Sequence, residues 1–165
     1  MKNFKKLVAA VMMAALLIVN VGCGGSESAG SSNVALTDIK AKMIEADSSL
    51  NDLEYVDAKT DGAKDKFATL VDYDYSKIAD YFYGYDKSGK ASEVVVVKLK
   101  DLADLPDLVS AFKTRAADRK GTFENYDPEQ VALVEHYVLT HESDCVAFII
   151  SEKNGMAEKA FKECF

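Results

Sequence analysis

Cysteine offers the most reactive side chain in this 165-residue sequence, and it occurs three times. Cys145 and Cys164 could form one disulfide, because an even pair of cysteines outside the reducing cytosol can be oxidised. A helix that followed the strand beginning at Cys145 and ran back along it would bring Cys164 near the start of that strand. Alternatively, both are reduced apolar residues of the core, since free cysteine is readily buried. The sequence leaves both states open.

Tyrosine is the second candidate, because five of the eight tyrosines lie between residues 73 and 85. Tyr81, Tyr83 and Tyr85 alternate along a predicted strand and therefore share one face of it. A tyrosine joins an apolar ring to a hydroxyl, which suits the surfaces of sugars and peptides. If this face is uncovered, the three rings form an aromatic binding surface. If helices cover it, the rings belong to the core and their hydroxyls reach its edge.

The other polar residues indicate neither a catalytic nor a metal site. His136 and His141 are the only histidines, and in one predicted strand a spacing of five puts them on opposite faces. No Gly-x-Ser-x-Gly, His-Glu-x-x-His, Cys-x-x-Cys or Walker-type glycine motif occurs. Acid pairs such as Asp72 and Asp74 are better explained as a solvated acidic face. The sequence therefore predicts no metal, no cofactor and no enzymatic activity.

The third cysteine, Cys23, ends a leader with three lysines and an apolar run of 13 residues, Leu7–Val19. This run is shorter than the roughly 20 residues that a membrane-spanning helix needs, so the leader is typical of a cleaved signal peptide. Val21-Gly22-Cys23 resembles the lipobox of bacterial lipoproteins, although Asn20 stands where leucine is usual. The resemblance implies a signal peptide over residues 1–22 and a diacylglyceryl group on Cys23. The alternative is an ordinary signal peptide with a coincidental cysteine.

Composition separates a tether from a domain. Residues 24–32 are glycine, serine, alanine and one glutamate, which cannot bury enough apolar surface to fold, so residues 23–35 are predicted to form a lipidated flexible tether. Residues 36–165 are predicted to form one globular domain. Without its leader the chain has 17 basic and 27 acidic residues, a net charge of −10. This charge excludes nucleic acid as a favoured partner.

Hydrophobic periodicity predicts the order of elements in the domain. An amphipathic helix over residues 37–50 comes first, and the segment after it, 55–66, is predicted to be a loop or ragged helix. A hairpin then pairs residues 80–86 with the valine-rich 92–100. A long helix over residues 105–123 follows, and Asp127-Pro128-Glu129-Gln130 resembles a helix-capping box. A second hairpin and a C-terminal helix complete the chain, over residues 136–142, 145–151 and 157–164.

This order, strand-strand-helix-strand-strand-helix, favours an α+β fold. We expect two layers: a mostly antiparallel sheet of about four strands, and helices on one face of it. The N-terminal helix precedes this unit. The apolar strand over residues 145–151 is expected to be central.

The chain also resembles a known family over roughly residues 36–161. The features that carry the resemblance are the lipobox, the valine-rich strand, the long charged helix, the strand from Cys145 to Ser151 and, most specifically, the segment Phe123 to Gln130 with the sequence Phe-Glu-Asn-Tyr-Asp-Pro-Glu-Gln. The family is the group of bacterial lipoproteins with domain of unknown function 4358. The resemblance implies a lipoprotein location and this fold, and it brings no catalytic residues or ligands.

Together these observations predict an extracytoplasmic lipoprotein on the outer face of the bacterial cell membrane, held there by the diacylglyceryl group on Cys23. We expect a non-enzymatic binding or interaction module whose partner is an envelope protein, a peptide or a glycan. Two alternatives remain: an unrecognised enzyme that acts on envelope material, and a structural component of a surface or spore-associated complex.

Overall fold

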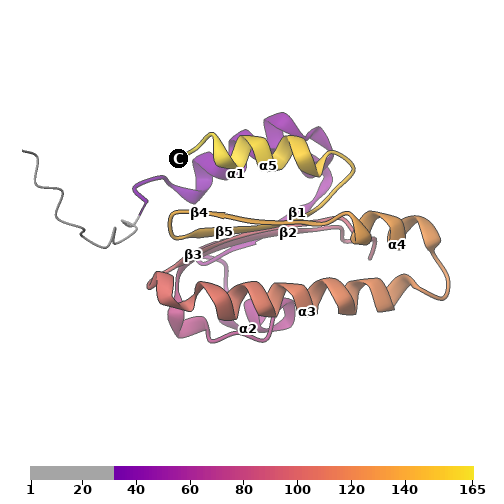
Figure 1. Cartoon of the computed structure of the whole chain (residues 1–165), viewed down its shortest axis with the longest axis horizontal. Helices are drawn as coiled ribbons and strands as arrows, with labels where there is room; N and C mark the ends of the chain where they lie inside the picture. Colours follow the sequence, from indigo (N-terminus) through magenta and orange to yellow (C-terminus); the bar gives the residue numbers. More distant parts are fainter. Residues whose placement is uncertain (1–31) are drawn as a thin grey trace, which may run out of the picture.

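A computed structural model describes residues 32–165, so the predicted signal peptide over residues 1–22, Cys23 and residues 24–31 lie outside the described part of the chain. The described residues form one antiparallel sheet covered by helices (Figure 1). Its strands are β1 (Glu54–Asp57), β2 (Ile78–Tyr85), β3 (Glu93–Leu99), β4 (Val138–Glu142) and β5 (Cys145–Ile150). Its α-helices are α1 (Leu36–Ala46), α2 (Ala63–Leu70), α3 (Leu105–Phe123), α4 (Pro128–Glu135) and α5 (Asn154–Lys162).

The α+β class and the predicted order from the first hairpin onward are confirmed. The sheet has five strands in the order β1-β2-β3-β5-β4, and all four neighbouring pairs are antiparallel. The strand missing from the prediction is β1, which lies in the segment expected to be loop or ragged helix. It is only four residues long and pairs along one side with β2. Strand β5 lies between β3 and β4, away from the edges, as expected.

Helices cover both faces of the sheet, which corrects the expectation of helices on one face. Figure 1 shows α1 and α5 on one side of the strands and α2 and α3 on the other. Each side has its own apolar core. On the side of α1 and α5, Ile39, Met43 and Phe161 pack against Val94, Val96 and Ile149 of the sheet. The fold therefore has three layers, with the sheet in the middle.

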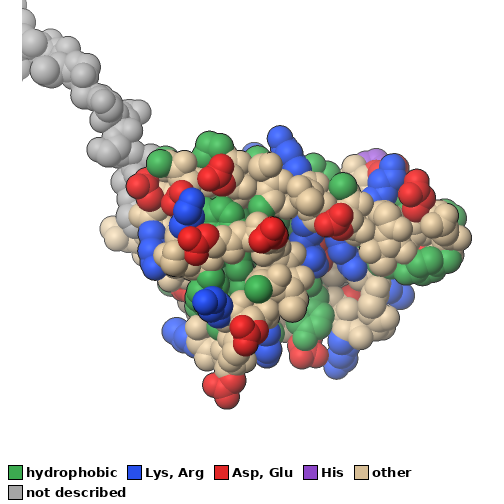
Figure 2. Space-filling view, turned by 90° about the horizontal axis from the view of Figure 1, so that it is seen from below, with side chains coloured by type: hydrophobic (Ala, Val, Ile, Leu, Met, Phe, Trp, Pro, Cys, Tyr) green, Lys and Arg blue, Asp and Glu red, His purple; other side chains and the backbone are tan. Residues whose placement is uncertain are grey.

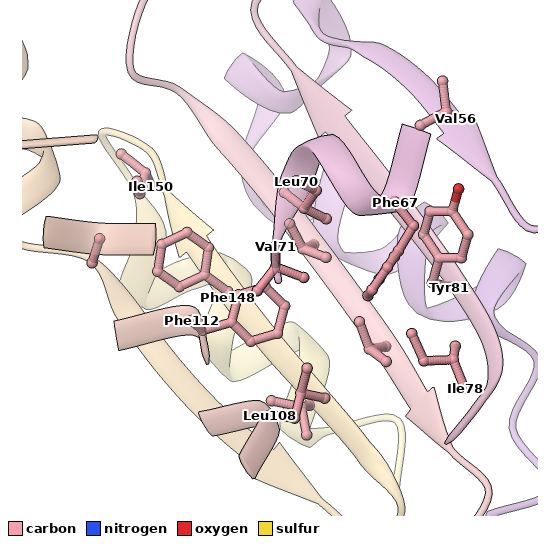
Figure 3. Packing of buried hydrophobic residues seen from close by; sticks show 14 of the residues in the cluster. Val56, Phe67, Leu70, Val71, Ile78, Tyr81, Leu108, Phe112, Phe148 and Ile150 are labelled. Atoms are coloured by element: carbon pink, nitrogen blue, oxygen red, sulfur yellow. The ribbon is translucent and has the colours of Figure 1, made fainter. Parts of the chain in front are cut away.

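The larger core lies between the sheet and α2 and α3 (Figure 3). Phe112 of α3 stacks on Phe148 of β5, with ring centroids 5.2 Å apart. Phe67 of α2 packs edge-on against Tyr81 of β2 at 5.0 Å. These two aromatic contacts fix where each helix lies on the sheet, because each large ring fills the space opposite one strand.

Two local predictions at helix starts have different outcomes. Asp127 caps α4 as predicted, since its carboxylate accepts a hydrogen bond from the Gln130 backbone N–H and Pro128 occupies the first helical turn. The Gln130 side chain does not complete a capping box, because its Oε1 accepts from the Ala91 N–H at 2.8 Å. The first predicted helix is divided: α1 ends at Ala46, and Asp47 caps a separate 3₁₀ turn, Ser48–Asp52.

Candidate functional site

The three tyrosines of β2 share one face of the sheet, as the alternation predicts, but they have different surroundings. All three face α2 and α3. Tyr81 is 1% exposed and its hydroxyl donates to the Ala63 carbonyl at 2.8 Å, so it belongs to the core. Tyr83 and Tyr85 are half-buried. The helices therefore cover Tyr81, whereas the rings of Tyr83 and Tyr85 lie at the edge of the covered region.

Tyr83 and Tyr85 line a hollow of about 200 Å³, which we call the tyrosine hollow; its other lining residues are Val56, Lys66 and Thr69. The two tyrosine rings have centroids 5.1 Å apart and planes inclined by 33°. The Tyr85 hydroxyl donates to Glu54 Oε1 at 2.9 Å, across the β1–β2 pair. The hollow thus combines two rings from the sheet with a cation and a hydroxyl from α2.

A buried ion pair holds Tyr83 in place. Glu93, the first residue of β3, has a side chain that is 1% exposed. Arg115 of α3 donates two hydrogen bonds to its carboxylate, from Nε to Oε1 at 2.8 Å and from Nη2 to Oε2 at 2.6 Å. Arg115 Nη2 also donates to the Tyr83 hydroxyl at 3.1 Å, and Nη1 donates to the Leu70 carbonyl at 2.7 Å. One guanidinium therefore joins the end of α2, the long helix and two strands.

A second arginine on the same face of α3 adds positive charge. Arg119, four residues after Arg115, has its Nε 3.7 Å from Glu93 Oε2 and donates from Nη2 to the Lys90 carbonyl at 2.6 Å. Its guanidinium lies 5.0 Å from the centre of the Phe123 ring. Glu93 is therefore neutralised from two positions one helical turn apart.

A groove between α2 and α3 adjoins the tyrosine hollow. This helix groove has a volume of about 490 Å³, and both Thr69, which also lines the tyrosine hollow, and Arg115 border it; the remaining lining residues are Ala68, Leu70, Val71, Asp72, Asp107, Ser110, Ala111, Thr114 and Asp118. Figure 2 shows this side of the molecule, where acidic and basic side chains are interspersed and apolar side chains show between them. Thr69 lies where the two spaces meet.

The surroundings of the two tyrosine hydroxyls raise their pKa values. Burial, followed by the charge of Glu93, raises the pKa of Tyr83 to about 12. The hydrogen bond to Glu54 raises the pKa of Tyr85, and partial burial adds to the effect. Both hydroxyls are therefore protonated near neutral pH and can act as hydrogen-bonding groups but not as bases. The four Arg115 hydrogen bonds already occupy the guanidinium on both of its edges.

Cys145 and Cys164, for which the sequence left a disulfide and two reduced thiols open, are free thiols in the structure. They lie on the same side of the sheet: Cys145 is buried in the core under α1 and α5, and Cys164 packs against that core from its margin. Burial, with a smaller contribution from Asp144, raises the pKa of Cys145 to about 12. The Cys164 thiol donates to the Ala160 carbonyl at 3.2 Å. Neither environment produces a reactive thiolate.

The two histidines are exposed and occupy different elements. His136 caps the C-terminus of α4, with its Nδ1 2.7 Å from the Ala132 carbonyl, so the predicted strand starts two residues later than expected. His141 lies in β4. Within residues 32–165 no group of three histidine, cysteine, aspartate or glutamate side chains could hold a metal ion, and no helix is long and apolar enough to cross a membrane.

Sequence reasoning identified the two tyrosines but missed Glu93, Arg115 and Arg119. One signal for them was present: Glu93 stands directly before a run of four valines, at a strand position whose neighbours in alternation, Val95 and Val97, are core residues. An inward-facing carboxylate needs a cationic partner.

Comparison with known proteins identifies the family. No curated protein and no solved structure matches the chain. The family model described as domain of unknown function (DUF4358) matches residues 51–151. This match extends from the 3₁₀ turn before β1 to the residue after β5, and it includes the tyrosine hollow, Glu93 and both arginines. It covers more than half of the sequence, and the chain therefore belongs to the family of proteins with domain of unknown function 4358.

Proposed function

We propose that this protein is a lipid-anchored, extracytoplasmic binding module that holds a polar ligand of the cell envelope, a glycan or an extended peptide, in the tyrosine hollow. The observation that carries the proposal is the pair of half-buried rings, Tyr83 and Tyr85, 5.1 Å apart on the wall of an open space. Such rings can stack on a sugar or peptide group while nearby hydroxyls and charges supply hydrogen bonds.

The preorganisation of the rings supports this proposal. Arg115 fixes the Tyr83 hydroxyl, and Glu54 fixes that of Tyr85, so neither ring has to lose much freedom when a ligand binds. The sheet below them is a rigid base, because β2 is paired on both sides, with β1 and with β3. The hollow therefore has the properties of a preformed binding site.

The anchor in this proposal is a diacylglyceryl group on Cys23. Two acyl chains would make membrane attachment durable, since each buried methylene contributes ~0.8 kcal/mol and a single chain gives only marginal binding. The lipobox-like sequence Val21-Gly22-Cys23 motivates this part of the proposal. A binding module held in this way would keep its ligand, or the structure that carries the ligand, close to the cell.

Ligand capture by matched tyrosine variants tests the proposal. The full chain, extracted from membranes in detergent, would be applied to arrays of wall glycans and wall peptides, and crosslinked to its partners in intact cells. Tyr85→Ala should abolish capture. Tyr126→Ala is the control, because Tyr126 is 68% exposed, in the loop between α3 and α4, and does not line the hollow.

Three results would contradict the proposal. Unchanged capture by Tyr85→Ala, with a normal circular dichroism spectrum, would exclude the tyrosine hollow. Loss of capture by Tyr126→Ala would place the binding site at the α3–α4 loop. Turnover of a wall substrate by the wild-type protein, lost on a single carboxylate substitution, would show an enzyme.

A further inference from the structure

The first residues of the described chain are fixed to one end of the sheet by a charged cluster, which we call the Ser32 clamp: Ser32, Lys98 and Asp144. The Ser32 backbone N–H donates to Asp144 Oδ1 at 3.1 Å, and Lys98 Nζ donates to the Ser32 carbonyl. Lys98 Nζ lies 3.8 Å from Asp144 Oδ2, and the side chains of both residues are largely buried. The Ser32 hydroxyl accepts a hydrogen bond from the Val34 N–H.

Strand register locates the clamp and the tyrosine hollow at opposite ends of the sheet. Lys98 pairs with Cys145, and Ile78 pairs with Leu99, so the clamp lies at the end where β2 begins and β3 finishes. Tyr85 pairs with Glu93 at the other end of the same two strands. Lys98 of the clamp and Glu93, the partner of Tyr85, are five steps apart on β3, which corresponds to about 17 Å at ~3.4 Å per residue.

The ribbon view agrees with this register. In Figure 1 the chain enters the domain at the left, beside the turn between β4 and β5 and close to the C-terminus. The loop between α3 and α4 lies at the right. The molecule therefore has one end that carries the tether and another that does not.

We infer that the domain stands on the membrane by the end that carries the Ser32 clamp and directs the tyrosine hollow away from the bilayer. The inference rests on the proposed lipid anchor at Cys23. Eight residues, 24–31, lie between Cys23 and Ser32. The nine Cα–Cα steps from Cys23 to Ser32 can span at most roughly 31 Å.

This orientation determines which material of the cell envelope can reach the tyrosine hollow. The clamp stays within the reach of the tether, whereas Tyr85 of the tyrosine hollow is about 17 Å farther out along the strands. The ligand therefore belongs to material beyond the membrane surface, such as a wall polymer or the ectodomain of another envelope protein, and not to lipid headgroups.

Energy transfer to the membrane measures the orientation. The full-length lipidated protein would be reconstituted into vesicles of phosphatidylethanolamine and phosphatidylglycerol that contain acceptor-labelled headgroups. One fluorophore would be attached to Ala103→Cys, at an exposed position after the clamp end of β3, or to Lys87→Cys, at an exposed position after Tyr85. Both variants would carry Cys164→Ser, while Cys145 is buried and protected from labelling.

We expect higher transfer from position 103 than from position 87. Ser32→Pro removes the N–H that donates to Asp144 without changing the domain core. Because the loss of this contact lengthens the part of the chain that is free to move, the difference in energy transfer between positions 103 and 87 should become smaller. Asn33→Ala, at the exposed neighbouring position, is the matched control and should preserve the difference.

Each other result has a distinct meaning. Equal or reversed transfer from protein that floats with the vesicles overturns the orientation and leaves the anchor standing. Protein that does not float refutes the anchor and the orientation with it. If the difference in energy transfer between positions 103 and 87 is unchanged in Ser32→Pro, the Ser32 clamp does not contribute to the orientation.

Discussion

Replacing Arg115 by methionine tests whether the buried ion pair assembles the candidate site. Methionine keeps much of the aliphatic length of arginine but removes its four hydrogen bonds, to Glu93 twice, to the Tyr83 hydroxyl and to the Leu70 carbonyl. Glu93 would then remain buried at 1% exposure, with Arg119 3.7 Å away as its nearest cation. We expect the free energy of unfolding to fall.

The expected size of this loss follows from the burial of the pair. Removing one partner of a buried ion pair costs about 3–5 kcal/mol, because the remaining charge stays desolvated. Arg119 offsets part of this cost, so Arg115→Met should lie near the lower end of that range. Such a loss is large against the total stability of roughly 5–15 kcal/mol that is typical of a domain.

Urea unfolding followed by circular dichroism provides the measurement, with a double-mutant cycle. Arg115→Met combined with Glu93→Gln should cost less than the sum of the two single substitutions, since the double variant no longer contains the buried carboxylate that Arg115→Met deprives of its main partner. Lys113→Met, at an exposed position of the same helix, is the control and should change stability by no more than about 0.5 kcal/mol. The reasoning is refuted if Arg115→Met costs no more than this control, or if the two effects simply add.

Three further predictions concern packing, pH and thiols. Gly84→Ala should destabilise the fold by about 1–3 kcal/mol, because its new Cβ would lie 2.5 Å from Tyr55 Cε1, and Tyr55→Val in the same chain should recover part of the loss in urea unfolding. The stability that protonated Tyr83 contributes is fully present below pH 10 and lost as the pH rises from 10 to about 12, because the unfolded chain loses the phenol proton first. In urea unfolding near pH 11, the free energy of unfolding of Tyr83→Phe should therefore decline less steeply with pH than that of the wild type, by up to about 1.4 kcal/mol per pH unit. Alkylation in denaturant without reductant, followed by mass spectrometry, should modify both Cys145 and Cys164, whereas an unmodified pair would show a disulfide.

The second helical layer could have been predicted from the valines. Residues 94–97 are four consecutive valines, and all four are at most 1% exposed. A strand with one solvated face alternates apolar and polar residues, so an uninterrupted apolar run indicates cover on both faces. Strand β5 carries the same signal. Both runs were visible in the sequence, and only the placement of the N- and C-terminal helices on the second face was missed.

Other errors arose where tertiary contacts override a local pattern. Strand β1 has the sequence Glu-Tyr-Val-Asp, which is too short and polar to stand out beside the following acidic segment, and it is ordered by pairing with β2. Gln130 fits a capping box locally, but in the folded chain its side chain accepts a hydrogen bond from the Ala91 N–H. These contacts join residues far apart in the sequence, 39 positions for Gln130 and Ala91, and no window of neighbouring residues contains them.

The tyrosine hollow could be predicted only in part, because it also depends on tertiary contacts. Alternation correctly put Tyr83 and Tyr85 on one face. It could not show that α2 covers Tyr81 through Phe67 while leaving the other two rings half-buried, because that depends on where a helix eight residues long lies on the sheet. The strand pattern indicates that Glu93 faces the core, but it does not identify Arg115, 22 residues later, as the partner.

The family match covers the sheet and the helices of one face, but not the helices of the other. Residues 51–151 contain all five strands, α2, α3 and α4, but neither α1 nor α5. Those two helices supply Ile39, Met43 and Phe161 to the second core. The matched segment therefore holds the candidate site, and the flanking helices seal the opposite face of its sheet.

Lipidation of Cys23 is the most direct test of the account, because the anchor, the compartment of the ligand and the orientation of the domain all depend on it. Cells that express the full chain would be grown with radiolabelled palmitate, and the protein would be recovered by immunoprecipitation beside a Cys23→Ala variant. We predict label on the wild-type protein and none on the variant. Equal labelling of the two proteins, or labelling of neither, would contradict the account.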